Sequence, residues 1–288
     1  MEVRHFFDPD TFTLTYLVFD PKTRDAVLID PVLDFDPASG AISETSSRAV
    51  AAAVKELGLR LHLILETHAH ADHLSGSQVI KRLFPQARLA ISQRITEVQK
   101  TFSQVFNMTG VRPEGKDFDL LLRDEETLEV GSLSIKVIPT PGHTPACTSF
   151  LIEDRLFTGD ALFMPDYGTG RCDFPDGSAS MLFDSISRLY ELPESTRVYV
   201  GHDYQPGGRE LKFMTTIGES KRENIQLKAQ TKKDEFVRFR EARDKTLKAP
   251  RLLLPSLQVN ILAGHLPLPE SNGRIYLKTP LTIKTEGT

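Results

Sequence analysis

Three of the eight histidines in this 288-residue chain lie within six positions, in the stretch ETHAHADHLSG that covers residues 66–76. His68 and His70 are two residues apart, so their imidazoles point to the same side of an extended segment. Both rings can then reach one metal ion at about 2.0–2.1 Å. Asp72 and His73 follow where the chain turns toward a helix. The turn presents their side chains to a point next to the first site, so they can bind a second ion. Paired metal ions in proteins typically lie ~3.5–4 Å apart.

Three later segments carry side chains with the same metal-binding chemistry. His143 stands in TPGHTPAC, between a Pro-Gly pair and Pro145, where a rigid loop fixes its ring. Asp160 follows Gly159 in FTGDALF, and His202 stands in VGHDY. Taken together with the first motif, these side chains favour a metal site over a set of unrelated surface or core histidines.

The segments between the motifs show which elements must position them. Alternating apolar residues predict strands at 12–20 and 26–30, and the turn residues between them predict a hairpin. Thr45, Ser46 and Ser47 are the cap candidates of a predicted helix. Further strands are predicted at 61–66, 87–91, 132–140, 148–153, 155–160 and 197–203, and helices at 43–57, 76–84, 95–106 and 178–192. Residues 210–248 are predicted to be mostly helical, and the last forty residues to hold short β-like runs such as RIYLKT.

The order of these elements predicts the fold class. Strands and helices alternate, but several strands follow one another as hairpins, which indicates an α/β (α+β) protein with mixed sheets and helices packed outside. Each predicted metal-binding segment comes directly after a strand, as shown by His68, His143, Asp160 and His202. Loops on a rigid scaffold commonly carry binding residues, so we expect these four loops to converge on one pocket.

Composition limits the classes of function. The net charge of −4 gives no general reason to expect nucleic acid or a membrane as a partner. Residues 209–251 hold 13 Lys and Arg against 7 Asp and Glu, which we interpret as the solvated face of C-terminal helices. No run in the chain approaches the ~20 apolar residues of a membrane span, and the N-terminus lacks a signal-peptide pattern. Cys147 and Cys172 form no C-x-x-C motif, so we predict a reducing, cytoplasmic location.

The motifs THAHADH, GHT, GDA and GHD, in this order, resemble the metallo-β-lactamase superfamily over roughly residues 10–210. The resemblance implies a catalytic domain over residues 1–209, built as an αββα sandwich of two mixed β-sheets flanked by helices. It also implies two metal positions, the first formed by His68, His70 and His143, the second by Asp72, His73 and His202, with Asp160 as a bridge. We expect residues 210–288 to form a helical and extended C-terminal extension packed on the same domain, which either covers the pocket mouth or mediates a homodimer.

The segment GDALFMPDYGTGRCDFPDG is similar to the persulfide dioxygenases, a glyoxalase II-like family in which a Gly-x-Gly-Arg-x-Asp-Phe pattern follows the GDA motif. The matching residues are Gly168, Gly170, Arg171, Asp173 and Phe174. Thr169 and Cys172 depart from the family, which commonly has Cys and Thr at these positions. We interpret Cys172 as a small residue in a tight loop rather than as a sulfur carrier.

This second resemblance implies one Fe(II) per chain, bound by His68, His143 and Asp160 as the catalytic residues. Two histidines and one carboxylate on one face of Fe(II) leave coordination positions open. Glutathione persulfide, or a related low-molecular-weight persulfide, and O2 would occupy them, and the reaction would yield sulfite and thiol in sulfide detoxification. The other metal-site side chains would orient ligands and water: His70, Asp72, His73 and His202.

Arg171 and Tyr204 are the candidate substrate-binding residues. The Arg171 guanidinium can form a bidentate pair with a substrate carboxylate. It can equally form an internal ion pair, for which the acidic neighbours are Asp166, Asp173 and Asp176. Tyr204 resembles the tyrosine that glyoxalase II enzymes place against glutathione, and packing at a strand end is an equal interpretation.

The same ligand set permits other functions. One or two Zn(II) ions could bind, and metal-bound water with a pKa near ~7 could hydrolyse a glutathione thioester, as in glyoxalase II, or a lactone. The positive charge of residues 209–251 would favour a nuclease, whose affinity for RNA should fall steeply with salt. A metal- or persulfide-binding sensor without catalysis is the third alternative.

Overall fold

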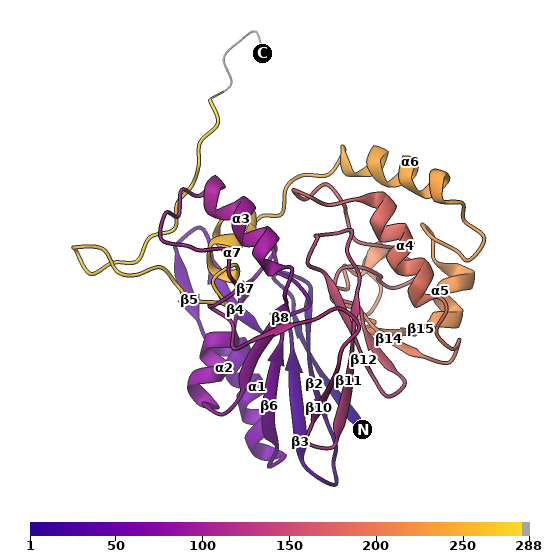
Figure 1. The fold of residues 1–288 in the computed structure, drawn as a ribbon, viewed down its shortest axis with the longest axis horizontal. Helices are drawn as coiled ribbons and strands as arrows, with labels where there is room; N and C mark the ends of the chain where they lie inside the picture. Colours follow the sequence, from indigo (N-terminus) through magenta and orange to yellow (C-terminus); the bar gives the residue numbers. More distant parts are fainter. Residues whose placement is uncertain (284–288) are drawn as a thin grey trace.

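The computed structural model describes residues 1–283, and the last five residues of the predicted C-terminal extension, 284–288, lie outside them. Two six-stranded β-sheets face each other, and helices cover the outer side of each sheet (Figure 1). This arrangement is the αββα sandwich that the sequence motifs imply, so the predicted fold class is confirmed.

The first sheet has the strand order β1-β2-β3-β6-β8-β9. Its strands are β1 (Glu2–Asp8), β2 (Thr13–Phe19), β3 (Asp25–Ile29), β6 (Arg60–Leu65), β8 (Arg88–Ser92) and β9 (Leu120–Leu122). The first three are antiparallel neighbours, whereas β3, β6, β8 and β9 run parallel. Parallel strands are buried on both faces and read as continuous apolar runs, which is why LHLIL and RLAI predict β6 and β8.

The second sheet has the order β10-β11-β12-β13-β14-β15. Its strands are β10 (Thr127–Val130), β11 (Leu133–Pro139), β12 (Thr148–Ile152), β13 (Arg155–Phe157), β14 (Arg197–Tyr199) and β15 (Met214–Thr216). Neighbours are antiparallel except β13 and β14, which are parallel because α4 (Ala179–Leu189) crosses between them. The carboxyl ends of β13 and β14 therefore lie side by side, and the loops that carry Asp160 and His202 start next to each other.

Two apolar layers hold the sandwich together. Between the sheets, Tyr16 and Ile29 of the first sheet pack in one buried cluster with Val137 and Phe150 of the second. Outside the first sheet, a second cluster contains residues such as Val54 from the covering helices, which are α1 (Thr45–Glu56), α2 (Ser77–Leu83), α3 (Ile95–Val105) and α7 (Leu253–Asn260). Burial of each large apolar side chain contributes roughly 1.5–3 kcal/mol to the free energy of unfolding. The two layers therefore hold the sheets in place, and with them the edge at which the motif loops begin.

A small third sheet lies next to the first motif. Its order is β5-β4-β7, formed by β4 (Val32–Asp36), β5 (Ala41–Ser43) and β7 (Leu74–Ser75). Because β7 starts directly after His73, its pairing with β4 fixes the chain just past the last histidine of the motif. The predicted cap of α1 is wrong, since its N-cap is Glu44. Ser46 instead bonds through its amide and hydroxyl to Asp34.

The C-terminal segment differs from its prediction in three places. Residues 210–248 contain α5 (Ile217–Glu223) and α6 (Lys233–Asp244), but also β15 and long loops, so the prediction of a mostly helical segment is wrong in extent. A 3-10 turn, η1 (Pro206–Gly208), precedes them. Helix α7 is missing from the prediction, and the RIYLKT run forms no strand. No helix within residues 1–283 is long and apolar enough to cross a membrane.

Candidate metal centre and its cavity

The THAHADH motif lies in the loop between β6 and β7, and Asp30 at the end of β3 anchors the start of this loop. The Thr67 amide and hydroxyl donate to the two carboxylate oxygens of Asp30 at 2.7 and 2.8 Å. The same hydroxyl lies 3.0 Å from Nδ1 of His68. These contacts orient the His68 ring and leave its Nε2 available to a metal. Asp30 was missed in the sequence, although it is the last residue of a predicted strand, as Asp160 is.

His68, His143 and Asp160 form the first group of metal-binding side chains. All three are buried, and one ligand atom of each lies within 4.8 Å of the others. Nδ1 of His143 lies 2.7 Å from the carbonyl oxygen of Arg171 and can donate to it. This leaves Nε2 of His143, which is 3.6 Å from Oδ2 of Asp160, as the ligand atom. The structure thus brings together the two histidines and the aspartate that were predicted to bind iron.

His70, Asp72 and His73 form a second group, also with ligand atoms within 4.8 Å of one another. His202 connects the two groups, since its Nε2 is 3.2 Å from Oδ1 of Asp160 and 3.3 Å from Oδ2 of Asp72. All seven side chains predicted for a site with one or two metal ions therefore meet at one edge of the sandwich.

Two carboxylates hold the His70 ring from behind. Its Nε2 lies 3.0 Å from Oδ1 of Asp30 and 3.3 Å from Oε2 of Glu66, which leaves Nδ1 for a metal. A carboxylate on the far nitrogen of a ligating histidine fixes the ring and increases its basicity. Glu66 in turn accepts hydrogen bonds from the hydroxyls of Ser75 and Ser77, at 2.5 Å each. Sequence reasoning did not single out Glu66, although it begins the motif segment.

The charges of the site shift the pKa values of its side chains. Burial, together with the nearby His70, lowers the pKa of His68 well below its usual value, so this ring is neutral and able to bind a metal. Burial also lowers the pKa of His202, but the charges of Asp160 and Asp72 outweigh it and raise this pKa to about 9. Burial raises the pKa of Asp160, but neighbouring histidines, His202 foremost, bring it well below its usual range.

Unpaired ligand atoms show that the site fits a metal ion. Within residues 1–283, Nε2 of His68, Nδ1 of His70 and Nε2 of His73 are buried and have no hydrogen-bond partner. Leaving a buried polar atom unpaired is costly, and a neutral imidazole nitrogen is a common metal ligand. Imidazoles combined with carboxylates suit both iron and zinc. The donor set therefore fits one or two such ions.

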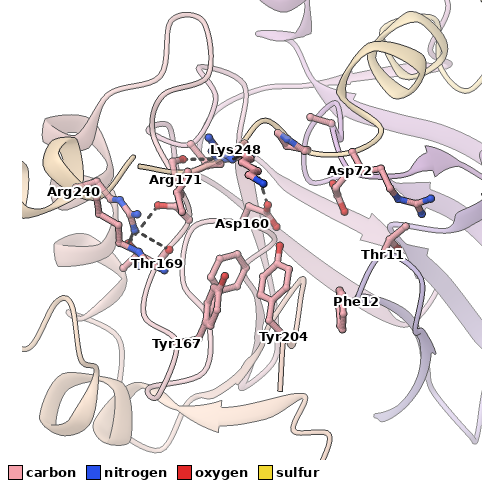
Figure 2. Close-up of a pocket in the computed structure, with 18 of the residues that line it drawn as sticks. Thr11, Phe12, Asp72, Asp160, Tyr167, Thr169, Arg171, Tyr204, Arg240 and Lys248 are labelled. Atoms are coloured by element: carbon pink, nitrogen blue, oxygen red, sulfur yellow. Dashed lines mark hydrogen bonds and ion pairs between the residues drawn. The ribbon is translucent and has the colours of Figure 1, made fainter. Parts of the chain in front are cut away.

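A cavity of about 390 Å³ opens beside the metal groups, and Asp72, His143 and Asp160 form part of its wall (Figure 2). Tyr167 and Tyr204 form another part, with ring centroids 4.6 Å apart in a stacked arrangement. In Figure 2 the Tyr204 hydroxyl points toward Asp160. The cavity thus joins the metal groups to a wall that can contact a bound molecule.

Arg171 lines this cavity, but its guanidinium is already paired. Nε and Nη2 donate to the two carboxylate oxygens of Asp173 at 2.6 Å each, and Nη1 donates to the carbonyl oxygen of Lys248 at 2.7 Å. The sequence offered Asp166, Asp173 and Asp176 as partners for an internal ion pair of Arg171, and the structure shows the pair with Asp173. Substrate binding by Arg171 and Tyr204 stays a prediction. Cys172 is buried, and burial raises the pKa of its thiol, in keeping with a small residue in a tight loop.

A buried network from the C-terminal segment holds the loop that carries Arg171. Arg240 is only 1% exposed, and it donates to Oδ1 of Asp244 at 2.6 and 3.0 Å and to the carbonyl oxygen of Thr169 at 3.2 Å. Oε1 of Gln226 accepts hydrogen bonds from the amide and hydroxyl of Thr169 at 3.1 and 3.0 Å. Side chains distant in sequence therefore fix this wall of the cavity.

Gly170 brings the same loop directly against the metal groups. A Cβ atom at this position would overlap the carbonyl oxygen of Asp160 and lie 3.5 Å from the Cβ of His143. Backbone packs on backbone here, so only glycine fits. Close packing beside two predicted ligands is the physical reason for the second glycine of the Gly-x-Gly-Arg pattern.

Arg243, Lys248 and Arg251 also line the cavity, from α6 and from the connector 245–252 that leads to α7. Unlike Arg171, none of the three takes part in an ion pair with another residue of the described chain, 1–283. Nε of Arg243 is buried and has no hydrogen-bond partner among these residues. Part of the positive charge that the sequence suggested for a solvated helix face therefore belongs to the cavity wall.

Residues 8–202 match the metallo-beta-lactamase superfamily, and the chain belongs to it. Over 292 residues it is 46% identical to a probable metallo-hydrolase of Burkholderia pseudomallei (strain 1710b), covering 98% of this chain and 99% of the relative. Over 205 residues it is 36% identical to the mitochondrial persulfide dioxygenase ETHE1 of Homo sapiens, covering 70% and 68% of the two chains. The crystal structure of ETHE1 from Myxococcus xanthus matches with a TM-score of 0.74 and 35% identity, over 92% of this chain and 100% of that chain. Both predicted resemblances are confirmed.

Proposed function

We propose that the chain is an iron-dependent persulfide dioxygenase, which oxidises glutathione persulfide or a related low-molecular-weight persulfide with O2. The observation that carries the proposal is the group His68, His143 and Asp160 beside a cavity of about 390 Å³. Two imidazoles and one carboxylate at one iron leave positions for further ligands. The likeness to the human and Myxococcus xanthus ETHE1 proteins supports the same reaction class.

The proposed reaction consumes one persulfide, one O2 and one water, and yields one thiol, one sulfite and two protons. The sulfur–sulfur bond breaks, the outer sulfur is oxidised and O2 is reduced. When bound, Fe(II) supplies the open coordination positions and the path for electrons between sulfur and oxygen. The chain's own residues hold the ion, orient the persulfide and limit access of water.

Tyr204 is the proposed hydrogen-bond donor to the substrate beside the metal. Burial first, and then the charges of Asp160 and Asp72, raise the pKa of Tyr204 well above its usual value, so its hydroxyl keeps its proton. A protonated phenol can donate to an anionic sulfur or oxygen atom. The stacked ring of Tyr167 keeps the Tyr204 side chain in place.

The charge of the cavity wall favours an anionic carrier of the persulfide. Arg243, Lys248 and Arg251 add three cationic groups without ion-pair partners in residues 1–283. Positive charge in a cleft attracts anions and binds carboxylates. Arg171 can join them only if its bond to Asp173 is shared or opened. We therefore propose a carrier with at least one carboxylate group, as glutathione has.

We further propose that residues 1–209 form the catalytic domain and that residues 210–288 form an extension packed on it. Up to residue 283, packing of the extension on the domain is supported by the connector 245–252 in the cavity wall. Strand β15, although it follows residue 209, is the edge strand of the second sheet. The two free, buried cysteines support a reducing, cytoplasmic location. A homodimer stays a prediction, as does the absence of nucleic acid among the partners.

A dinuclear zinc hydrolase of a glutathione thioester, of the glyoxalase II type, or of a lactone is the second candidate. The observation that favours it is the second group, His70, Asp72 and His73, which His202 connects to Asp160. The Burkholderia relative, named a probable metallo-hydrolase, supports this alternative. Two adjacent metal ions would activate water for attack on a carbonyl.

Metal analysis and oxygen uptake separate the two candidates. Protein purified without added metal is analysed for Fe and Zn per chain, and then for O2 consumption with glutathione persulfide. The proposal predicts close to one Fe per chain and one O2 consumed per sulfite formed. Two Zn per chain, with thioester hydrolysis that continues unchanged without O2, would establish the hydrolase instead.

A further inference from the structure

We infer that Asn260, in helix α7, is a positioning residue for the metal-ligand loop 66–76. Nδ2 of Asn260 donates to the carbonyl oxygens of His70 and His73, at 2.8 Å each. Oδ1 of Asn260 accepts a hydrogen bond from the Ser75 amide, also at 2.8 Å. The partners are 185 to 190 positions away in the sequence. A single side chain thus joins two metal-binding residues to the strand that follows them.

Helix α7 is itself fixed, so Asn260 can act as an anchor for the loop. Ile261, the next residue, is fully buried in the outer core cluster, and its carbonyl oxygen accepts a hydrogen bond of 2.8 Å from Gln99 of α3. Gln78 of α2 donates to the carbonyl oxygen of Ala263 at 2.7 Å. Asn260 is 4% exposed. The anchor is therefore held from two other helices and is shielded from water.

The loop needs an anchor because of how its ligands are arranged. His70 and His73 direct free ring nitrogens into the site, and their carbonyl oxygens accept no hydrogen bond from any other residue within 1–283. Without Asn260 these buried carbonyls would be unpaired, and the turn could relax to pair them elsewhere. Such a change of the backbone would move both rings. Fixing the two carbonyls keeps the two ligand nitrogens at a set separation.

This inference depends on the metal centre and not on the reaction proposed above. It holds for a mononuclear iron site, in which the His70 group orients ligands, and for a dinuclear zinc site, in which the group binds an ion. Its test therefore measures metal binding and not turnover, so failure of the persulfide dioxygenase proposal would leave its outcome unchanged.

Gln258 provides a matched control. It is a buried amide two positions before Asn260 in the same helix, and it is 2% exposed. Its side chain exchanges hydrogen bonds with the backbone of Lys278 in the C-terminal tail, at 2.7 and 2.8 Å. Its third bond, to the carbonyl oxygen of Leu254, stays inside α7. Replacing Gln258 should weaken the packing of α7 without touching the metal-ligand loop.

The experiment compares the full chain with its Asn260→Asp, Asn260→Ala and Gln258→Ala variants. Zn(II) affinity is measured by competition with a chelator, the visible spectrum after loading with Co(II), and the thermal midpoint by circular dichroism. Asn260→Asp keeps the size and the acceptor of Asn260 but loses the two donated hydrogen bonds. We expect both Asn260 variants to lose about 10–100-fold in Zn(II) affinity and to alter the Co(II) spectrum. Gln258→Ala should lower the midpoint and leave affinity and spectrum unchanged.

Two results would overturn the inference. One is a folded Asn260→Asp variant with parental affinity and spectrum, whose midpoint falls only as far as that of Gln258→Ala, because Asn260 would then serve stability alone. The other is failure of both Asn260 variants to fold at a temperature where Gln258→Ala folds, because Asn260 would then support the whole fold rather than the loop.

Discussion

At the metal end of the cavity, imidazoles and carboxylates come from loops that directly follow strands of the two sheets, and every one of the first group is buried. At the mouth, cationic and phenolic side chains come from the loop 163–171, from α6 and from the connector 245–252. The first end is held by backbone pairing, by carboxylates behind the ligands and by the Asn260 amide of α7. The second is held by long side chains that reach across from the C-terminal segment.

The difference assigns different tasks to the two ends. Unpaired ligand atoms in a buried group determine which ion binds and which reaction follows. Partly exposed charges around a mouth determine which anion enters. Substitutions at the metal end should therefore remove the metal, whereas substitutions at the mouth should change KM or stability and leave the metal in place.

The largest effect is expected from Asp160→Ala. The carboxylate belongs to the first group and also contacts His202, so its loss should abolish iron binding and activity, as should His68→Ala and His143→Ala. Iron per chain by elemental analysis and O2 uptake with persulfide measure this. Stoichiometric iron and full O2 uptake in Asp160→Ala would show that the ligand assignment is wrong.

The next largest effect is expected from Arg240→Met, in the buried network that holds the cavity wall at the mouth. Removing one partner of a buried ion pair typically costs about 3–5 kcal/mol, because the other charge stays buried. Arg240→Met should therefore lower the free energy of unfolding by about this amount and retain bound metal. Urea unfolding measures it, and Arg240→Met combined with Asp244→Leu should recover part of the loss. Metal loss without a change in stability would contradict the separation of the two ends.

A smaller effect is expected for the unpaired cations. Arg243→Gln and Lys248→Gln should each raise KM for glutathione persulfide roughly 3–10-fold and leave kcat unchanged, since a charged hydrogen bond at a partly exposed site contributes about 1 kcal/mol. The persulfide of a carrier with esterified carboxylates is the control, and with it the variants should match the parent. Arg171→Ala should also mainly raise KM, and an unchanged KM would remove the proposed role of Arg171.

The smallest effect is expected from Asp173→Asn. Burial raises the pKa of Asp173, but hydrogen bonds from Arg171 bring it below its usual value, and the side chain is 37% exposed. Such a carboxylate stabilises the fold above the unfolded pKa of about 3.9 and loses this effect as the pH falls through the folded value. The variant should lose less than about 1 kcal/mol at pH 7. The free energies of unfolding of both proteins should converge only when the pH falls below the folded pKa of Asp173, and a difference that persists there would exclude the ionised pair as its cause.

The metal end could be predicted from the sequence because its signals are local. Each ligand follows an apolar run of strand length, and His68, His70 and His73 are close in sequence. The mouth could not be predicted in the same way, since Arg240 and Thr169 are 71 positions apart. Thr169 stands inside the Gly-x-Gly-Arg pattern, but Arg240 stands in no motif that would link the two residues. Asn260 gives no local signal either, because nothing near it shows that its amide faces a loop nearly 190 positions earlier.

The errors in secondary structure have related causes. Helix α7 begins LLPS, and Pro255 in its first turn is tolerated there but reads as a helix breaker in the sequence. The RIYLKT run alternates like a strand, but within residues 1–283 it pairs with no neighbouring strand. Strand β15 has only three residues, too few to show a period.

The contact between residue 170 and the carbonyl of residue 160 limits how this protein could be redesigned. If the proposed persulfide reaction is to be adapted to a bulkier or differently charged thiol, position 170 cannot be changed, because a side chain there would displace Asp160, a predicted metal ligand. Adaptation to another thiol has to start at the mouth of the cavity, where larger side chains can be introduced without disturbing the metal groups.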